Sequence, residues 1–340
     1  MDPVSTMEAL AETEEMTDLK SGVAMSDAAR SPAIPPLVIT AHRGWQLINV
    51  AELWRYRELL YFLAWRDVKV RYKQTLLGAA WAVIQPFMMM VVFTIFLSRM
   101  AHMSSGDFPY PVFVYAGLLP WTFFSTAISN AGNSVVGSER LITKIYFPRL
   151  AIPFASVAAA IVDFLIAFVV LLGMMLWYRI APTWGLLMVP VLLVLLALAA
   201  TGVGTLLAAL NVAYRDFRYV IPFLAQLWMF ATPTVYMQPS EHSTEPKPVA
   251  ASTVVARDGD HTAERSSAVP TATQGAVPDD IQHLLNLNPL TGLIGCFRAA
   301  TLGGEMPWGQ LAYSSGGVVV LFLAGCFYFR RVEDSFADVI

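Results

Sequence analysis

One acidic residue lies inside a long apolar stretch of the sequence: Asp163, in AAAIVDFLIAFVV. A carboxylate at membrane depth is costly unless it is paired, so such residues often mark proton relays or substrate contacts. The alternative is a packing role, in which the carboxylate is hydrogen-bonded to a neighbouring span. Both interpretations are compatible with the sequence.

Residue types that often take part in catalysis or metal binding do not form a recognisable motif in this sequence. No G-x-x-x-x-G-K-[ST] phosphate-binding motif and no G-x-S-x-G nucleophile elbow occur. Cys296 and Cys326 are far apart, and the histidines have no spacing typical of metal ligands. The sequence therefore predicts no metal site, no cofactor bound by this chain and no enzymatic activity.

The composition is typical of an integral membrane protein. Of 340 residues, 56% are hydrophobic and 14% are charged, and the mean hydropathy is +0.56. A soluble domain needs a more polar surface than this. The net charge of −3 gives no support for nucleic-acid binding.

The apolar segments predict an all-α, polytopic membrane fold with six transmembrane helices, since each has roughly the twenty residues that a crossing needs. Pro222 and Pro233 interrupt the fifth segment and predict a kinked or incomplete crossing. Gly202 and Gly204 in the fourth predict close helix packing. The predicted spans are Leu77–Leu97, Pro111–Ser129, Ile152–Trp177, Leu186–Leu210, Val220–Tyr236 and Leu311–Phe329.

The remaining segments surround these spans in a membrane domain over 51–340. Residues 1–50 are acidic at the start and rich in small residues, which predicts a disordered tail. Residues 53–74 have an apolar face and a basic face, as in an interfacial helix or a soluble helix packed on a partner. The Ser/Thr/Pro-rich stretch 239–280 predicts a disordered insertion. Residues 281–302 predict either short helices that dip into the membrane or a surface loop.

Lysine and arginine residues gather in alternate connections between the spans. They precede the first span, follow the second and fourth, and follow the last as Arg330 and Arg331, whereas the other short connections contain only Arg99 and Arg179. The positive-inside rule therefore predicts that both termini are cytoplasmic and that the long insertion is extracytoplasmic.

Aromatic residues in the spans are candidates for a substrate path. Trp81, Gln85 and Phe96 fall on one side of the first predicted span. Sugars stack on aromatic rings, so a path lined in this way would suit a glycan; an aromatic belt at the membrane surface is the alternative. The full set of candidates is Trp81, Gln85, Phe87, Phe96, Tyr115, Trp121, Phe124 and Trp228.

The connection GSERLITKIYFPRLAIP, after the second span, has apolar residues at helical spacing and a proline stop at Pro148. It predicts a short amphipathic helix over 138–147 on the cytoplasmic surface. Such a helix either docks in a groove of a partner or serves as a passive connector.

Four stretches of the sequence resemble one family of membrane proteins, and they extend over most of the chain from about Leu53. The chain is similar to the permease subunits of ABC exporters that move lipid-linked O-antigen, capsule or teichoic-acid polymers across the bacterial inner membrane. The stretches are LLYFLAWRDVKVRYKQTLLGAAWAVIQP, SERLITKIYFPRLAIP, NVAYRDFRYVIPFLAQLWMFATPTVY and LNPLTGLIGCFRAATLG.

The resemblance implies a homodimer of six-span subunits with two copies of a separate ATPase, which binds the ATP and magnesium. It also implies that 53–74 is the interface helix, that 138–147 is a coupling helix, and that 281–302 forms an outward-facing gate. The residues implied for coupling are Ser138, Glu139, Arg140, Lys144 and Tyr146, and those for the gate are Asn288, Pro289 and Arg298. The insertion and the long N-terminal tail depart from the family pattern.

Three other functions are alternatives. A permease of the same architecture could move a drug or a lipid. A membrane-embedded acyl- or glycosyltransferase would need clustered His, Asp or Glu near a membrane face, which the sequence lacks. A proton-coupled transporter would depend on Asp163.

Overall fold

The computed structural model describes residues 54–73, 78, 80–96, 108–144, 147–232, 288–333 and 336. All the described residues belong to one compact unit, and they form helices and connections without a strand. The predicted disordered tail and the predicted insertion at 239–280 lie outside the described residues.

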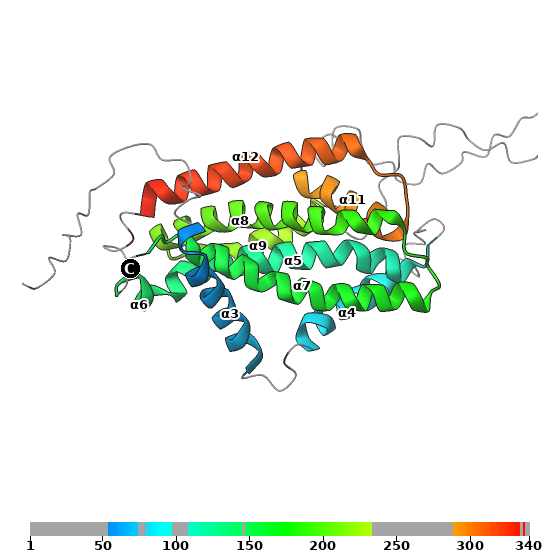
Figure 1. The fold of residues 1–340 in the computed structure, drawn as a ribbon, viewed down its shortest axis with the longest axis horizontal. Coiled ribbons are helices and arrows are strands. Elements are labelled where there is room, and N and C mark those ends of the chain that lie inside the picture. Colours follow the sequence, from blue (N-terminus) through cyan, green and yellow to red (C-terminus); the bar gives the residue numbers. More distant parts are fainter. Residues whose placement is uncertain are drawn as a thin grey trace, which may run out of the picture. The chain divides into compact units, whose positions relative to one another are not determined.

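Four helices are long and apolar enough to cross a membrane. They lie alongside one another in the bundle (Figure 1). They match the second, third, fourth and sixth predicted spans; whether the first and fifth segments also cross stays a prediction. The four are α5 (Tyr110–Gly137), α7 (Ala151–Trp177), α8 (Val189–Ala213), which follows the 3₁₀ helix η2 (Trp184–Met188), and α12 (Trp308–Val332).

Helix α5 is the most buried of the four. It packs against both α7 and α8, and α8 packs in turn against α12. The apolar core between them includes Tyr115, Phe124, Phe164, Leu196 and Phe297. A second apolar cluster lies at the end of the bundle where α6 is found, and it includes Leu63, Ile142, Leu150 and Phe329.

The first and fifth predicted spans correspond to shorter helices. Helix α4 covers Ala80–Phe93, with helical structure to Phe96, and α9 covers Phe217–Phe230. Each contains an internal proline, Pro86 and Pro222. At 14 residues these helices rise about 21 Å, which is less than the ~30 Å hydrocarbon core.

Three further helices correspond to the other predicted elements. Helix α3 (Arg57–Lys73) occupies the predicted interface helix. Helix α6 (Glu139–Ile142) is one turn, shorter than the predicted helix at 138–147, because the chain leaves the helix at Thr143, ahead of Pro148. Helix α11 (Pro289–Leu302) covers the second half of the predicted gate, and residues 281–287 lie outside the described part of the chain.

The predicted role of the glycines in α8 is confirmed. A Cβ atom on Gly202 would lie 2.6 Å from the Cα of Phe322 on α12, and one on Gly204 would lie 2.6 Å from the Cβ of Ala131 on α5. Real Cβ atoms do not approach other atoms so closely, so a side chain at either position would push the helices apart. The absence of side chains here lets α8 pack tightly on two neighbours.

We expect Gly202→Ala to lower the free energy of unfolding by about 1–3 kcal/mol, the usual cost of overpacking. Gly316→Ala on α12 is the matched control, since its added Cβ would meet no atom within 4 Å. Thermal unfolding of the purified proteins in detergent measures both changes. Equal stability of the two variants would contradict the close approach of α8 and α12.

Candidate functional site

The intramembrane carboxylate of Asp163 on α7 is bound to two residues of α3. Arg71 forms an ion pair with it through Nη1, and the hydroxyl group of Tyr72 donates a hydrogen bond to its other oxygen. Burial, and after it the hydrogen bond to Asp163, raise the pKa of the Tyr72 phenol, so this group stays protonated and continues to donate. These contacts favour the packing interpretation of Asp163, although the partner is the predicted interface helix and not another span.

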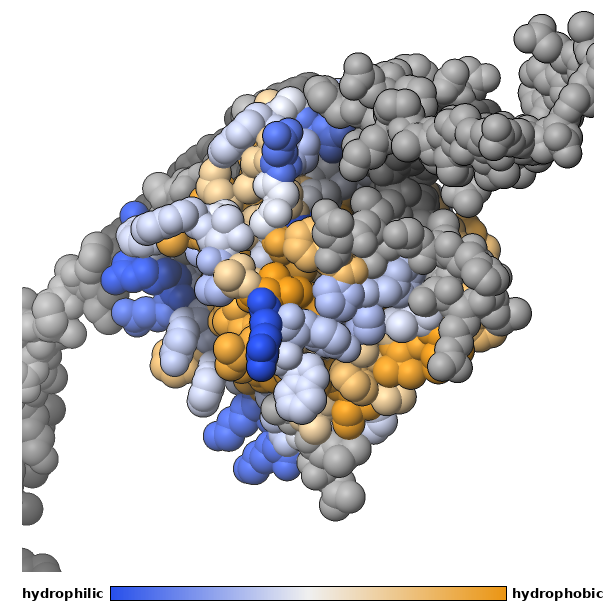
Figure 2. Space-filling model, turned by 90° about the vertical axis from the view of Figure 1, so that its right-hand side faces the viewer, coloured by the Kyte–Doolittle hydropathy of each residue, from blue (hydrophilic) through white to orange (hydrophobic). Residues whose placement is uncertain are grey.

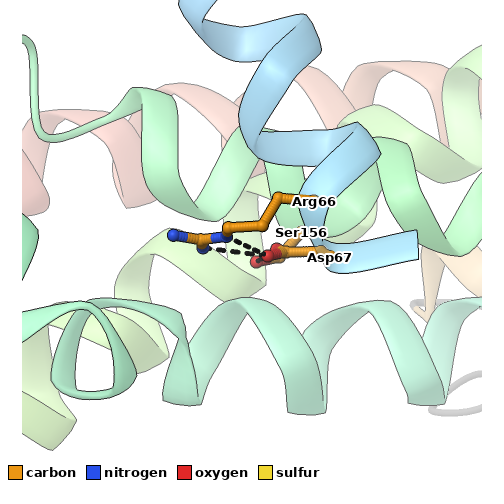
Figure 3. Close-up of polar contacts among 3 residues, drawn as sticks. All are labelled: Arg66, Asp67 and Ser156. Atoms are coloured by element: carbon orange, nitrogen blue, oxygen red, sulfur yellow. Dashed lines mark hydrogen bonds and ion pairs between the residues drawn. The ribbon is translucent and has the colours of Figure 1, made fainter. Parts of the chain in front are cut away.

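A second polar contact joins the same two helices, one turn earlier on α3. The hydroxyl group of Ser156 on α7 lies 3.4 Å from Oδ2 of Asp67, and Nε and Nη2 of Arg66 donate to Oδ1 of Asp67 at 3.1 and 2.9 Å (Figure 3). Asp67 and Arg71 are four residues apart, so they lie on the same side of α3. Both bind α7, which fixes how α3 is rotated against the bundle.

The candidates for a substrate path divide into an exposed set and a buried set. On α4, Trp81 and Phe96 are 55% and 56% exposed, and Phe87 and Gln85 are also exposed. On α5, Tyr115, Trp121 and Phe124 are buried within the chain. These three rings fill the spaces between α5 and its neighbours, because α5 is the central helix. That they line a substrate path stays a prediction.

The buried aromatic residues have identifiable packing contacts. Tyr115 donates a hydrogen bond from its hydroxyl group to the carbonyl oxygen of Ala167 on α7, at 3.1 Å. The ring of Phe124 packs edge-on against Trp228 of α9, with 5.2 Å between centroids. Tyr115 and Phe124 thus hold α5 against α7 and α9. Trp228 is half-buried, so it also forms part of the surface.

Asn288 is the centre of a hydrogen-bond network between α9 and α11. Its Oδ1 accepts from Nε1 of Trp228 at 3.2 Å and from the backbone amide of Leu290 at 3.1 Å, which makes it the N-cap of α11. Its Nδ2 donates to Oγ1 of Thr232 at 2.8 Å and to the carbonyl oxygen of Ala231 at 3.3 Å. One side chain thus joins the end of α9 to the start of α11.

The other two gate candidates lie on α11 itself. Pro289 is the first residue of the helix, where a missing amide hydrogen costs nothing. The guanidinium group of Arg298 lies 4.1 Å from the ring centroid of Phe113 on α5, a cation–π contact. Helix α11 packs against α5, α8 and α12, so it is an integral part of the bundle.

We expect Asn288→Leu to lower the free energy of unfolding by about 2–4 kcal/mol, because four hydrogen bonds of about 0.5–1.5 kcal/mol each are lost from one residue. Gln226→Leu removes an exposed amide from α9 and is the control. Unfolding by titration with a denaturing detergent gives both values. A loss no larger than that of the control would contradict the network.

The candidate coupling residues lie in and around α6. Glu139, Arg140 and Lys144 are exposed, whereas Ser138 is buried, and Tyr146 lies outside the described residues. The helix is anchored by Ile142, whose side chain is buried in the second apolar cluster. The arrangement presents charged side chains on a short segment that is fixed to the bundle at one point.

The described residues hold no group of three or more His, Cys, Asp or Glu side chains that could bind a metal ion. Cys296 and Cys326 are free and buried in separate helices. What the described part of the chain does offer is a membrane-embedded bundle with exposed aromatic side chains and exposed charged segments at one end.

Comparison with known proteins agrees with this architecture. The O-antigen export system permease protein RfbA of Myxococcus xanthus is 32% identical over 86% of this chain and 98% of its own length. A protein of the same name from Klebsiella pneumoniae is 21% identical over 83% of this chain and 95% of its own. The polysialic acid transport protein KpsM of Escherichia coli is 25% identical over 47% of this chain and 62% of its own. The family model described as ABC-2 type transporter matches residues 58–243, and the chain therefore belongs to the ABC-2 type transporter family.

Proposed function

We propose that this chain is the membrane permease subunit of an ATP-driven exporter that moves a lipid-linked polysaccharide, such as an O-antigen, across the bacterial inner membrane. The observation that carries the proposal is similarity along nearly the whole length of a relative named as an O-antigen export permease. The family membership is consistent with a transport role for this chain. ATP hydrolysis then belongs to a separate ATPase, present in two copies beneath two copies of this chain.

The proposed orientation has the α6 end in the cytoplasm. Arg140, Lys144 and Arg331 are exposed at or near this end. The opposite end, seen in Figure 2, has hydrophilic groups between apolar ones. It exposes Trp177 and Trp184, the kind of aromatic residue that lies at membrane surfaces.

The proposed path for the polymer lies between two copies of the chain. Helices α4 and α9 are each too short to cross alone, and both expose aromatic side chains. Trp81 and Phe96 on α4, with Phe223 and Phe230 on α9, offer ring faces on which sugars can stack. Asn288 and α11 would form the outer gate, because the network at Asn288 connects α9 with α11.

The proposed coupling to ATP hydrolysis runs through α6. Movement of the ATPase would press on Glu139 and Arg140, and Ile142 would transmit the displacement to the apolar cluster at this end of the bundle. Leu63 of α3 belongs to the same cluster, so the interface helix would be displaced with it.

Deletion of this chain's gene in the source bacterium tests the proposal. We expect surface polysaccharide to disappear while the lipid-linked polymer accumulates inside the cell, and a plasmid copy to restore export. Surface polymer is measured by periodate oxidation and hydrazide labelling of intact cells. Unchanged surface polymer in the deletion strain would favour a permease for a drug or a lipid.

A further inference from the structure

Helix α5 has an unusual surface for a helix inside a membrane protein. Between Val112 and Val135, every position that is not buried carries a hydroxyl or carboxamide side chain, and every buried position is apolar or aromatic. Five of the polar residues follow the spacing i, i+4, i+7, i+8 and i+11, which places them along one side of the helix. We refer to these five as the polar stripe: Thr122, Thr126, Ser129, Asn130 and Asn133.

The polar stripe differs from the surfaces of the bundle that suit lipid. Helix α7 exposes Leu165, Val169 and Leu176, and α12 exposes Val319, Val320 and Leu323. Lipid tails offer no hydrogen bonds, so a lipid-facing surface is apolar. The half-buried side of α5 carries hydroxyl and carboxamide groups in place of apolar side chains, which indicates that it faces water or a polar molecule.

Several groups on the polar stripe have hydrogen-bonding capacity that the described residues do not use. The hydroxyl groups of Thr126 and Ser129 make no hydrogen bond there, and Nδ2 of Asn130 is covered without an acceptor in the same part of the chain. In contrast, Thr122 donates to the carbonyl oxygen of Leu119 at 3.0 Å and Asn133 donates to that of Ser129 at 2.8 Å. Unsatisfied polar groups are costly in an apolar medium, so the half-buried hydroxyl groups of Thr126 and Ser129 need a partner from outside.

The chemistry of the polar stripe selects an uncharged ligand. Helix α5 contains no charged residue between Tyr110 and Gly137, so it offers no ion pair to a phosphate or a carboxylate. Hydroxyl and carboxamide groups both donate and accept, as sugar hydroxyl groups do. Each such hydrogen bond is weak in net terms, because water competes for the same groups. A ligand held in this way can exchange one contact for the next.

We infer that the polar stripe is a binding surface for the sugar residues of the transported polymer, with Thr126 and Ser129 making exchangeable hydrogen bonds to sugar hydroxyl groups. This inference rests on the proposed export function and adds a second recognition element to the aromatic side chains of α4, which packs against α5. The rings stack on the faces of the sugars, and the polar stripe binds the hydroxyl groups at their edges.

Thiol labelling tests whether the polar stripe is in contact with water, and it does not require transport. Cys296 and Cys326 are replaced with alanine, and single cysteines are introduced as Thr126→Cys, Ser129→Cys and, for the lipid-facing control, Val169→Cys. We expect a membrane-impermeant, charged maleimide to label the two stripe positions about tenfold faster than Val169→Cys, because only a hydrated thiolate reacts. Labelling no faster than at position 169 overturns the inference.

Export by Thr126→Val combined with Ser129→Ala tests sugar contact. We expect surface polymer to appear several-fold more slowly while the ATPase activity of the purified complex is retained. Thr201→Val on α8 is the control, since its hydroxyl group donates to the carbonyl oxygen of Ala197 in its own helix and export should be unchanged. Normal export by the double variant overturns the inference even if the labelling succeeds. Failure of the wild-type chain to restore polymer to a deletion strain would instead contradict the proposed function.

Discussion

Asp163→Ala is expected to lower the free energy of unfolding by about 2–3 kcal/mol. Breaking a buried ion pair costs about 3–5 kcal/mol, and the loss is smaller here because the side chains of Arg71 and Asp163 keep 32% and 20% of their surface exposed. The same substitution removes the acceptor of the Tyr72 hydroxyl group. Unfolding of the purified protein by a denaturing detergent measures the loss.

Two further variants show whether the loss comes from the ion pair. Arg66→Gln breaks an exposed pair with Asp67 and should cost less than about 1 kcal/mol. The charge-swapped variant Arg71→Asp with Asp163→Arg should recover a large part of the stability lost by Asp163→Ala. If the swapped variant is less stable than Arg71→Asp alone and Asp163→Arg alone, the two charges do not interact favourably. Export that depends on the proton gradient and is lost in Asp163→Asn would favour the proton-relay interpretation.

Glu139→Ala combined with Arg140→Ala is expected to lower polymer export about tenfold, the scale of a coupling free energy of 1–3 kcal/mol. The two side chains are exposed on α6, so their removal should change the free energy of unfolding by no more than about 0.5 kcal/mol. Stimulation of the ATPase by the permease should fall in parallel. Export is measured in cells and ATP hydrolysis in the purified complex.

The control for this experiment removes one acidic and one basic residue from the opposite end of the bundle. Arg179 and Glu305 are both exposed, and the double replacement with alanine makes the same change in net charge. It should leave export and ATPase stimulation unchanged. Equal loss in both double variants would indicate a general effect of charge, and normal export in the α6 variant would remove this helix from the coupling mechanism.

Hydropathy predicted the long helices with small errors. The third predicted span begins within one residue of α7 and ends at the same residue, since nearly all of its residues are apolar. The second predicted span is too short, because α5 continues to Gly137 through Ser129, Asn130 and Asn133, whose polarity resembles that of a connection. The helical spacing of these polar residues was the signal that would have extended the helix and revealed the polar stripe.

Contacts between distant parts of the chain were not accessible from the sequence. Arg71 and Asp163 are 92 positions apart. The sequence predicts a helix at the membrane surface for Arg71 and the middle of a span for Asp163. Residue type also did not distinguish Trp81, which is exposed, from Trp121, which is buried. Burial depends on which helices become neighbours, and one sequence does not specify this.

The hydrogen bond between Asn288 and Thr232 has a consequence for how the chain tolerates additions. The chain leaves the described part of the bundle at Thr232 and returns at Asn288, and these two side chains are in direct contact. This contact holds the two ends of the connection together whatever the length of the chain between them. We therefore expect an epitope tag or a small reporter domain inserted between residues 241 and 280 to leave α9 and α11 in place. A tag at this position would allow purification of the protein and would show which side of the membrane the connection occupies.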